Sequence, residues 1–143
     1  MDKQGKMIKL LRLQNKMEEL ETIAVFLSGL AGEWKIPSSF TMTLNLVIEE
    51  AFTNVVKYAY KDDRLHIIEI SFEKTNNRLK IKIIDDGEPY DPNQHSGPDV
   101  MLPAEERSIG GLGIYLIKKM MDEFEYQRIG NKNVLIMKKE LVK

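Results

Sequence analysis

The spacing of the apolar residues changes in the middle of the chain, and this change restricts the folds that the sequence can adopt. Within residues 40–60 the apolar side chains recur at the period of an α-helix. After Asp63 they alternate with polar and charged side chains, which is the pattern of strands buried on one face. A long helix followed by such strands predicts a protein in which helices cover a sheet.

Two strands joined by a turn account for the alternating segment. Its apolar side chains on one face are Ile68, Ile70, Phe72, Leu79, Ile81 and Ile83. Residues 75–77 (Thr-Asn-Asn) have turn chemistry, so a hairpin is expected. The alternation continues to Asp85 and Gly87, which therefore share the apolar face. Because burial of an unpaired carboxylate is costly, Asp85 is expected either to lie at a frayed strand end before a turn or to accept hydrogen bonds from a specific partner.

Glu50 and Asn54 lie four residues apart in the predicted long helix, so their side chains project into the same space. The apolar residues beside them are Val47, Ile48, Ala51 and Val55. Asn is unfavourable in a helix interior because its side chain competes for backbone groups. Two interpretations of the pair are open at this point. It is either a satisfied polar network at a helix edge, or a carboxylate that handles a proton beside an amide oxygen that holds a hard cation such as magnesium.

The remaining segments complete the expected order of elements. Residues 6–13 predict an edge strand whose buried face the pattern does not fix. Asn15 and Glu18 have the spacing of a capping box, and helical spacing follows them. Residues 123–139 predict two strands around a turn at residues 130–133. The sum is an α+β fold, a two-layer α/β sandwich with a mixed, mostly antiparallel sheet that helices cover on one face.

A segment without periodicity, at about residues 88–110, separates the hairpin from the next helix. It contains four of the five prolines, and a loop of this length in a compact domain is usually a functional lid or a disordered segment. It ends in Gly-Gly-Leu-Gly at residues 110–113, and helical spacing begins at Ile114. Unobstructed backbone amides at a helix N-terminus bind phosphate, although turn glycines before a helix give the same pattern. No Gly-Lys-Ser or Gly-Lys-Thr follows, so this is not a Walker P-loop.

Length and composition exclude several classes of protein. A chain of 143 residues predicts a single domain, residues 1–143. The net charge of -1 and the even spread of the 21 basic residues give no electrostatic footprint for nucleic acid. The chain contains no cysteine, and neither His66 nor His95 has a metal-ligand partner in the sequence. Since no apolar run resembles a signal peptide or a membrane span, we expect a cytoplasmic protein without a membrane partner.

Three segments together resemble one known superfamily. They are IEEAFTNVVKYAY, IIDDGEPYDP and ERSIGGLGIYLIKKMMD, in this order and at a specific spacing. From about residue 6 to residue 140 the chain resembles the GHKL ATP-binding superfamily, whose Bergerat fold is shared by gyrase, Hsp90, sensor histidine kinases and MutL. Within it, DDGEPYDP and the small single-domain layout look most like the anti-sigma-factor serine kinases of bacterial partner-switching systems. The resemblance implies ATP and Mg²⁺ as cofactors and an ATP lid in the aperiodic segment.

The resemblance also implies roles for individual residues. Glu50 would be the general base and Arg107 the cation on the terminal phosphate, which makes these two the catalytic candidates. Asn54 would hold magnesium, Asp85 would accept the adenine amino group, and Gly87 would let the backbone approach the base. The residues that the resemblance places around the nucleotide are Asn54, Lys57, Tyr58, Asp85, Gly87, Gly111, Leu112 and Gly113. The last two glycines would offer backbone amides to the phosphates.

Three positions depart from the pattern of the related kinases. Tyr58 stands where they often carry His, Pro89 replaces the second glycine of the Asp-x-Gly-x-Gly box, and Ile109 adds a residue before the glycines. The proline is similar to the anti-sigma subfamily. The tyrosine and the added residue bear on catalysis more than on nucleotide binding.

Three functions follow from the resemblance. The first is a protein serine kinase that uses magnesium-ATP, phosphorylates a small antagonist protein, and sequesters a sigma factor or a similar partner when the antagonist is phosphorylated. The second is a non-catalytic switch, in which ATP binding changes partner affinity without phosphoryl transfer. The third is a histidine-kinase catalytic module, which is least favoured because no phosphoacceptor helix pair precedes the domain. The first helix is also compatible with a homodimer.

Overall fold

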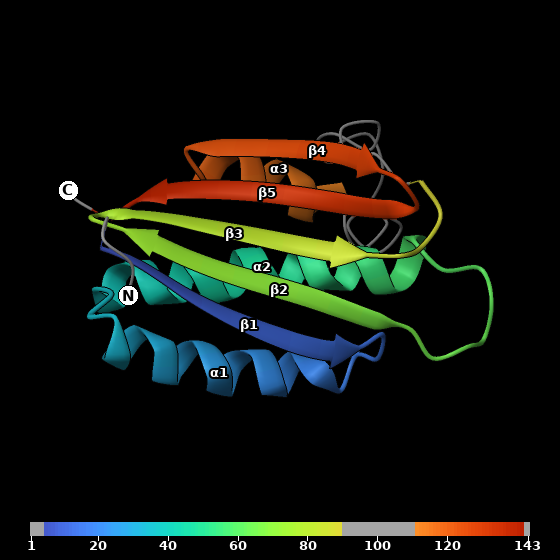
Figure 1. Cartoon of the computed structure of the whole chain (residues 1–143), viewed down its shortest axis with the longest axis horizontal. Coiled ribbons are helices and arrows are strands. Elements are labelled where there is room, and N and C mark those ends of the chain that lie inside the picture. The colour runs from blue at the N-terminus through green and yellow to red at the C-terminus, as the bar shows by residue number, and fades with distance from the viewer. Residues whose placement is uncertain (1–4, 90–110, 142–143) are drawn as a thin grey trace.

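Eight elements make up residues 5–89 and 111–141, the part of the chain that this computed structural model describes. They are β1 (Lys6–Gln14), α1 (Glu19–Glu33), α2 (Ser38–Tyr58), β2 (Ile67–Thr75), β3 (Arg78–Asp85), α3 (Gly111–Met120), β4 (Glu123–Ile129) and β5 (Lys132–Glu140). The side chains of residues 111–114 lie outside the description. The strands form one sheet in the order β1-β2-β3-β5-β4 (Figure 1).

All four strand pairings of this sheet are antiparallel. Two hairpins account for β2–β3 and β4–β5. The two helices between β1 and β2 carry the chain along the sheet and back, so β2 also runs against β1 (Figure 1). β3 and β4, which α3 connects, run in the same direction. They do not pair with each other, because β5 lies between them and is antiparallel to both. The predicted α+β two-layer sandwich is confirmed, and the described sheet is antiparallel throughout rather than mixed.

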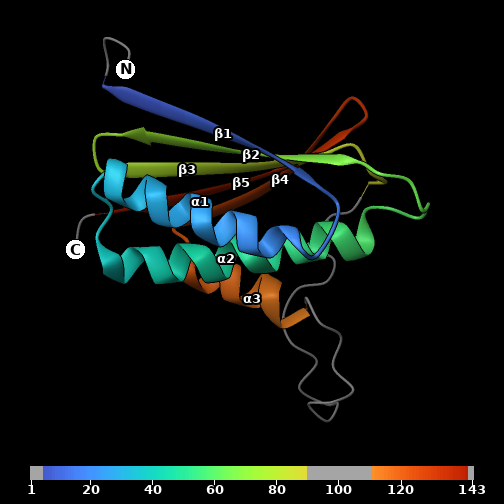
Figure 2. The same cartoon turned by 90° about the horizontal axis from the view of Figure 1, so that it is seen from below.

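The three helices lie on one face of the sheet, and the other face is open (Figure 2). Between the helices, α2 packs against both α1 and α3. The apolar side chains predicted to point inward from the hairpin are all fully buried, and they are Ile68, Ile70, Phe72, Leu79, Ile81 and Ile83. The alternation therefore identified the core face of both strands. Among the described residues, no helix has the length and apolar character needed to cross a membrane.

β1 is an edge strand, as predicted, and the structure fixes the face that the pattern left open. Leu13 is 1% exposed and belongs to the core. Ile8 and Leu10 are 60% and 53% exposed, because they project from the open face of the sheet, where they pair with Glu73 and Ser71.

The segment between β1 and α1 differs from the prediction. The N-cap residue of α1 is Glu18, which makes no side-chain capping bond, so the predicted capping box is wrong. The Asn15 side chain instead accepts a hydrogen bond from the backbone amide of His66 at 2.9 Å and donates one to the carbonyl of Arg64 at 3.3 Å. Asn15 thus fastens the segment between α2 and β2 to the end of β1.

The C-terminal hairpin is confirmed, with a tighter turn than expected. β4 ends at Ile129 and β5 begins at Lys132, so Gly130 and Asn131 alone form the turn. Gly130 has φ 60°, a conformation that favours glycine in such a two-residue turn. Asn133 consequently lies inside β5, directly opposite Asp85 of β3.

Candidate functional site

α2 carries the predicted pair of polar side chains. Asn54 is 1% exposed, and Glu50, one turn earlier, is half-buried. Neither amide atom of the Asn54 side chain has a hydrogen-bond partner among the described residues. An unsatisfied buried polar group costs about 1–3 kcal/mol, so each such group in a folded protein needs an explanation. The satisfied network that the sequence left open is therefore not formed by the described part of the chain.

The chemistry of these side chains fits a hard cation. Magnesium is usually held by one or two protein oxygens together with the phosphates of a substrate. The buried amide oxygen of Asn54 is a hard ligand of this kind, and its nearest acidic neighbour along the helix face is Glu50. Asn54 has therefore the burial, the atom type and the open bonding capacity that such a ligand requires.

The electrostatic surroundings of Glu50 suit a proton acceptor. Burial raises the pKa of Glu50 above its ordinary value, the charge of Glu49 raises it further, and the charge of Lys57 lowers it. A carboxylate with a raised pKa binds a proton more readily near neutral pH. Lys57 is exposed, and Tyr58, the last residue of α2, is half-buried.

Asp85 at the end of β3 is 3% exposed and accepts two hydrogen bonds at the same oxygen. Its Oδ1 atom accepts from the backbone amide of Gly87 at 2.8 Å and from Nδ2 of Asn133 at 2.8 Å. Burial is the main cause that raises the pKa of Asp85, and these two bonds lower it. The structure thus gives Asp85 specific partners in place of the frayed strand end.

Gly87 brings the end of β3 against the C-terminal end of α2. A Cβ atom at this position would lie 2.4 Å from the carbonyl oxygen of Ala59. The next residue, Glu88, donates its backbone amide to the same carbonyl at 2.7 Å. The close neighbour of Gly87 in the described structure is therefore Ala59, the C-cap residue of α2, a contact that the sequence did not predict.

Three residues of the C-terminal hairpin complete the surroundings of Asp85, and none was singled out in the sequence. Asn133 is 2% exposed and accepts a hydrogen bond from the Tyr126 hydroxyl at 2.6 Å. Arg128 donates from Nη1 to the carbonyl of Gly87 at 2.8 Å. Asn133 lies close after a turn and is a residue type that is common in turns, so the sequence does not single it out. Its contact with Asp85, 48 residues earlier in the chain, follows only from the register between β3 and β5.

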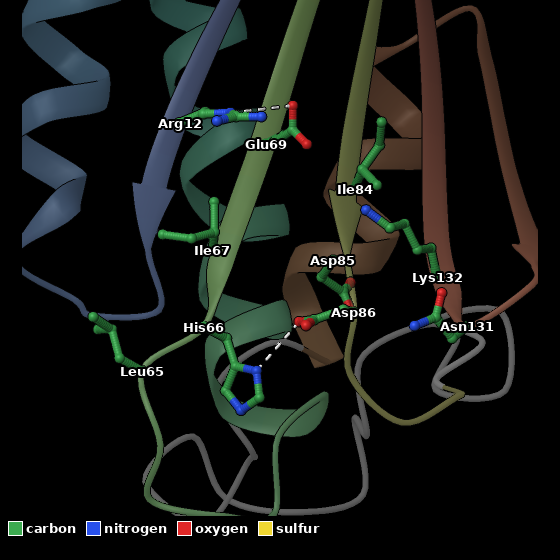
Figure 3. Close-up of a pocket in the computed structure, with 10 residues that line it drawn as sticks. All are labelled: Arg12, Leu65, His66, Ile67, Glu69, Ile84, Asp85, Asp86, Asn131 and Lys132. Carbon is green, nitrogen blue, oxygen red and sulfur yellow. Dashed lines mark ion pairs between the residues drawn. The ribbon is translucent and has the colours of Figure 1, made fainter.

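A second polar cluster surrounds His66, next to Asp85. The two ring nitrogens of His66 lie 2.8 Å from Asp62 and 3.3 Å from Asp86, and Figure 3 shows the second contact. The ring stacks on Tyr60 with the centroids 4.2 Å apart, and the Tyr60 hydroxyl donates to Asp86 at 3.2 Å. Burial raises the pKa of Tyr60, so its hydroxyl stays a donor. The cluster joins the end of α2 and the start of β2 to the residue after Asp85.

Two hollows flank the segment that follows β3. One, of about 440 Å³, lies at the end of α2 and includes Ala59, Gly87 and Arg128 in its lining. The other, of about 500 Å³, includes Glu69 and Ile84 and is drawn in Figure 3. Neither is lined by Glu50 or Asn54, which lie earlier in α2. The described residues thus bring Asp85 close to the end of α2, but neither of these two hollows is lined by both Asp85 and the pair Glu50 and Asn54.

The predicted glycines lie at the start of α3, which begins at Gly111. The expectation that they stand at a helix N-terminus is confirmed. Since α3 packs on α2, the backbone of Gly111, Leu112 and Gly113 belongs to the helix beside the one that carries Asn54. Arg107 and residues 90–110 of the predicted lid lie outside the described residues.

Comparison with known proteins places this geometry in a family. A family model described as the histidine kinase-like ATPase domain matches residues 13–139. The chain belongs to the histidine kinase-like ATPase domain family. A curated relative, the serine-protein kinase RsbW of Bacillus thuringiensis (strain Al Hakam), is 32% identical over 132 residues, which cover 90% of this chain and 82% of that protein. RsbW of Bacillus cereus (strain ZK / E33L) is 31% identical over the same shares.

Solved structures share the fold of this histidine kinase-like ATPase domain. The RsbU and RsbW domains of a Mycobacterium tuberculosis protein match with a TM-score of 0.66 at 13% identity, over 93% of this chain and 32% of that one. The catalytic domain of the histidine kinase ThkA matches with a TM-score of 0.55 at 13% identity, over 93% and 96%. At these identities the likeness concerns the fold alone, and it confirms the predicted Bergerat ATP-binding fold.

Proposed function

We propose that this histidine kinase-like ATPase domain is a protein serine kinase that phosphorylates a small antagonist protein. The observation that carries the proposal is Asn54, a buried amide without a partner among the described residues, one helical turn from the half-buried Glu50. Relatives that are 32% identical over 90% of the chain are named serine-protein kinases, which supports the same activity here. ATP is the nucleotide implied by membership of an ATPase domain family.

Two polar residues of the core bind the nucleotide in this proposal. The amide oxygen of Asn54 holds Mg²⁺, which supplies charge neutralisation and order at the phosphates when it is bound. The carboxylate of Asp85 accepts a hydrogen bond from the adenine amino group. The backbone amides of Gly111 and Gly113 and the guanidinium of Arg107 hold the phosphates, while Lys57, Tyr58, Gly87 and Leu112 lie around the nucleotide.

Glu50 is the general base of the phosphoryl-transfer step in this proposal. The serine oxygen of the antagonist forms a bond to the terminal phosphorus, the bond from that phosphorus to the bridging oxygen breaks, and ADP leaves. Glu50 accepts the proton of the serine hydroxyl. Burial raises the pKa of Glu50, which makes the carboxylate a better acceptor for this proton.

The proposed partners are the antagonist protein and a sigma factor or an analogous regulatory protein, both in the cytoplasm. The phosphorylated antagonist releases the kinase, which then sequesters the sigma factor. This partner set rests on the relation to RsbW and on the resemblance to the anti-sigma kinases. A homodimer through α1 is part of the same proposal.

Transfer of labelled phosphate from ATP to a cognate antagonist tests the proposal. Wild-type protein is expected to give phosphoserine, and Glu50→Gln is expected to abolish it while ADP binding persists. Glu49→Gln is the matched control, because Glu49 is the adjacent acid and lacks the spacing to Asn54. Undiminished transfer by Glu50→Gln would rule out the base assignment. No binding of ATP or ADP by wild type, with or without magnesium, would rule out the nucleotide site.

A non-catalytic switch is the second candidate, and Tyr58 favours it because this half-buried residue replaces the His that related kinases often carry. The switch predicts nucleotide-dependent partner binding without phosphoserine. Such binding would survive Glu50→Gln and fail in Asp85→Asn. Phosphoserine formation by the wild-type protein excludes this alternative.

A further inference from the structure

Asn133 uses the complete hydrogen-bonding capacity of its side chain around Asp85. Its Nδ2 atom donates to Oδ1 of Asp85 at 2.8 Å and to the carbonyl of Glu88 at 2.7 Å. Its Oδ1 atom accepts from the Tyr126 hydroxyl at 2.6 Å and from Nη1 of Arg128 at 3.1 Å. A side-chain amide has two donors and two acceptor lone pairs. Asn133 therefore has no bond to spare for a ligand, and its action on one has to pass through Asp85.

The orientation of this amide follows from its partners. Arginine only donates hydrogen bonds, whereas an ionised carboxylate and a backbone carbonyl only accept them. Turning the amide over would place its NH₂ group against Arg128 and its oxygen against Asp85 and the carbonyl of Glu88. The nitrogen is thus directed at Asp85 by the chemistry of its neighbours.

The same hairpin also holds the residues that follow Asp85. Arg128 donates from Nη1 to the carbonyl of Gly87 as well as to Asn133. Arg128 and Asn133 are paired across β4 and β5, and Asn133 is paired with Asp85 across β5 and β3. Three adjacent strands consequently fix the position of the carboxylate and of the segment after it.

The two oxygens of Asp85 are left in different states by these contacts. Oδ1 accepts the bonds from Asn133 and from the backbone amide of Gly87. Oδ2 takes neither bond and is the atom that can accept one from a ligand. An amino purine offers an N–H group to such an acceptor, whereas a keto purine offers an oxygen in the corresponding place. A protonated Asp85 would instead be able to donate to the keto oxygen.

We propose that Asn133 is a positioning residue that keeps Asp85 a pure acceptor with one oxygen available to the base, and thereby decides that the site takes an amino purine over a keto purine. This inference deepens the proposed function, on which it rests for the identity of the ligand as a purine nucleotide. Asn133 acts without touching the ligand.

The charges around Asp85 set the sign of the expected effect. Burial and the charge of Asp86 raise its pKa, while the Asn133 bond, the Gly87 amide and the charge of Arg128 lower it. Tyr60, two residues after the end of α2, also faces it as a neutral phenol. Besides Asp85 and Asp86, the charged and titratable side chains that line the neighbouring hollow are Arg12, His66, Glu69 and Lys132 (Figure 3). Removal of the Asn133 bond therefore raises the pKa of Asp85, and the carboxylate is lost at a higher pH.

Two variants at position 133 and one control test the proposal. Asn133→Leu has a similar size and no hydrogen bonds, and Asn133→Ser keeps one donor. Asn131→Ser is the matched control, because Asn131 lies exposed in the turn two residues away. The titration of the Asp85 carboxyl is followed by NMR in the nucleotide-free protein. ADP and IDP, which differ in the amino and keto groups, are titrated calorimetrically between about pH 5 and pH 8.

The expected result is a shift of the Asp85 titration in Asn133→Leu by about one pH unit upward, with a smaller shift in Asn133→Ser and none in Asn131→Ser. The ratio of ADP to IDP affinity falls about tenfold in Asn133→Leu at the pH where wild type is still ionised. If Asn133→Leu does not fold, Asn133→Ser carries the test. Wild-type ADP binding with an unchanged titration and an unchanged ratio in the variants overturns the role of Asn133. Wild type that binds neither nucleotide overturns the proposed function instead, and the NMR titration still tests the contact.

Discussion

Gly87, two residues after the end of β3, packs directly against Ala59, the C-cap residue of α2. A Cβ atom on Gly87 would lie 2.4 Å from the carbonyl oxygen of Ala59 and 2.7 Å from its Cβ atom. The amide of Glu88 donates to the same carbonyl at 2.7 Å. This contact sets the separation between the strand that ends in Asp85 and the helix that carries Asn54. Any side chain at position 87 would therefore have to increase the separation between this strand and this helix.

Gly87→Ala is expected to lower the free energy of unfolding by about 1–3 kcal/mol and to weaken ADP binding, because the clash is with backbone atoms that have little room to move. Urea denaturation and calorimetric titration measure the two effects. Gly29→Ala in α1 is the matched control, since nothing lies within 4 Å of its added Cβ atom. Ala is favoured over Gly in a helix by about 0.5–1 kcal/mol, so this variant gains stability. Equal unfolding midpoints for Gly87→Ala and wild type would contradict the steric explanation.

Asn54→Leu is expected to separate stability from function. Leucine removes the two unpaired amide atoms from the core, so the free energy of unfolding without nucleotide rises by about 1–3 kcal/mol. The same change removes the proposed ligand of Mg²⁺, so magnesium-dependent ADP binding is lost. Asn45→Leu on the same helix, at a half-buried position, is the control and keeps the binding. A variant that is less stable than wild type would show that the Asn54 amide is satisfied in solution.

The parts of the fold that the sequence predicts well depend on local periodicity. The hairpin core positions were all confirmed because alternate side chains of a strand necessarily share a face. α2 was predicted within two residues of each end for the corresponding reason. The predicted capping box at Asn15 is wrong because the Asn15 side chain makes a contact distant in the sequence. It accepts a hydrogen bond from the backbone amide of His66 instead of capping α1.

The surroundings of Asp85 depend on strand pairing, which the local periodicity of the sequence does not predict. Strand parity indicated that Asp85 points inward and needs a partner. The partner, Asn133, depends on the register between β3 and β5, and that register is not set by either strand alone. Its neighbour Arg128 enters through the pairing of β4 with β5. A sequence in which Asn133 follows Gly130 and Asn131 looks like a longer turn until the tertiary pairing is known.

The rate of phosphoryl transfer is expected to fall at low pH as Glu50 becomes protonated. Burial raises the pKa of Glu50, so this acid limb lies above the ordinary value of 4.5. The charge of Glu49 raises the pKa further and that of Lys57 lowers it. Glu49→Gln therefore moves the acid limb to lower pH, and Lys57→Gln moves it to higher pH. Transfer rates at saturating ATP across the pH range measure both shifts. Shifts of the same sign in the two variants would exclude Glu50 as the titrating base.

The contacts of His66 predict a pH dependence of stability. The hydrogen bond with Asp62 is the main cause that raises the pKa of His66 above its ordinary value of 6.5. Because the folded protein binds this proton more tightly than the unfolded chain, the contribution is complete below the unfolded pKa and is lost as pH rises through the folded pKa. Between about pH 6 and pH 8.5 the urea midpoint of wild type should fall more than that of His66→Gln. Asp62→Asn removes the main cause and should flatten the dependence, whereas the adjacent control Asp63→Asn keeps it. Parallel pH profiles for wild type and His66→Gln would show that the His66 contacts carry no proton-linked stability.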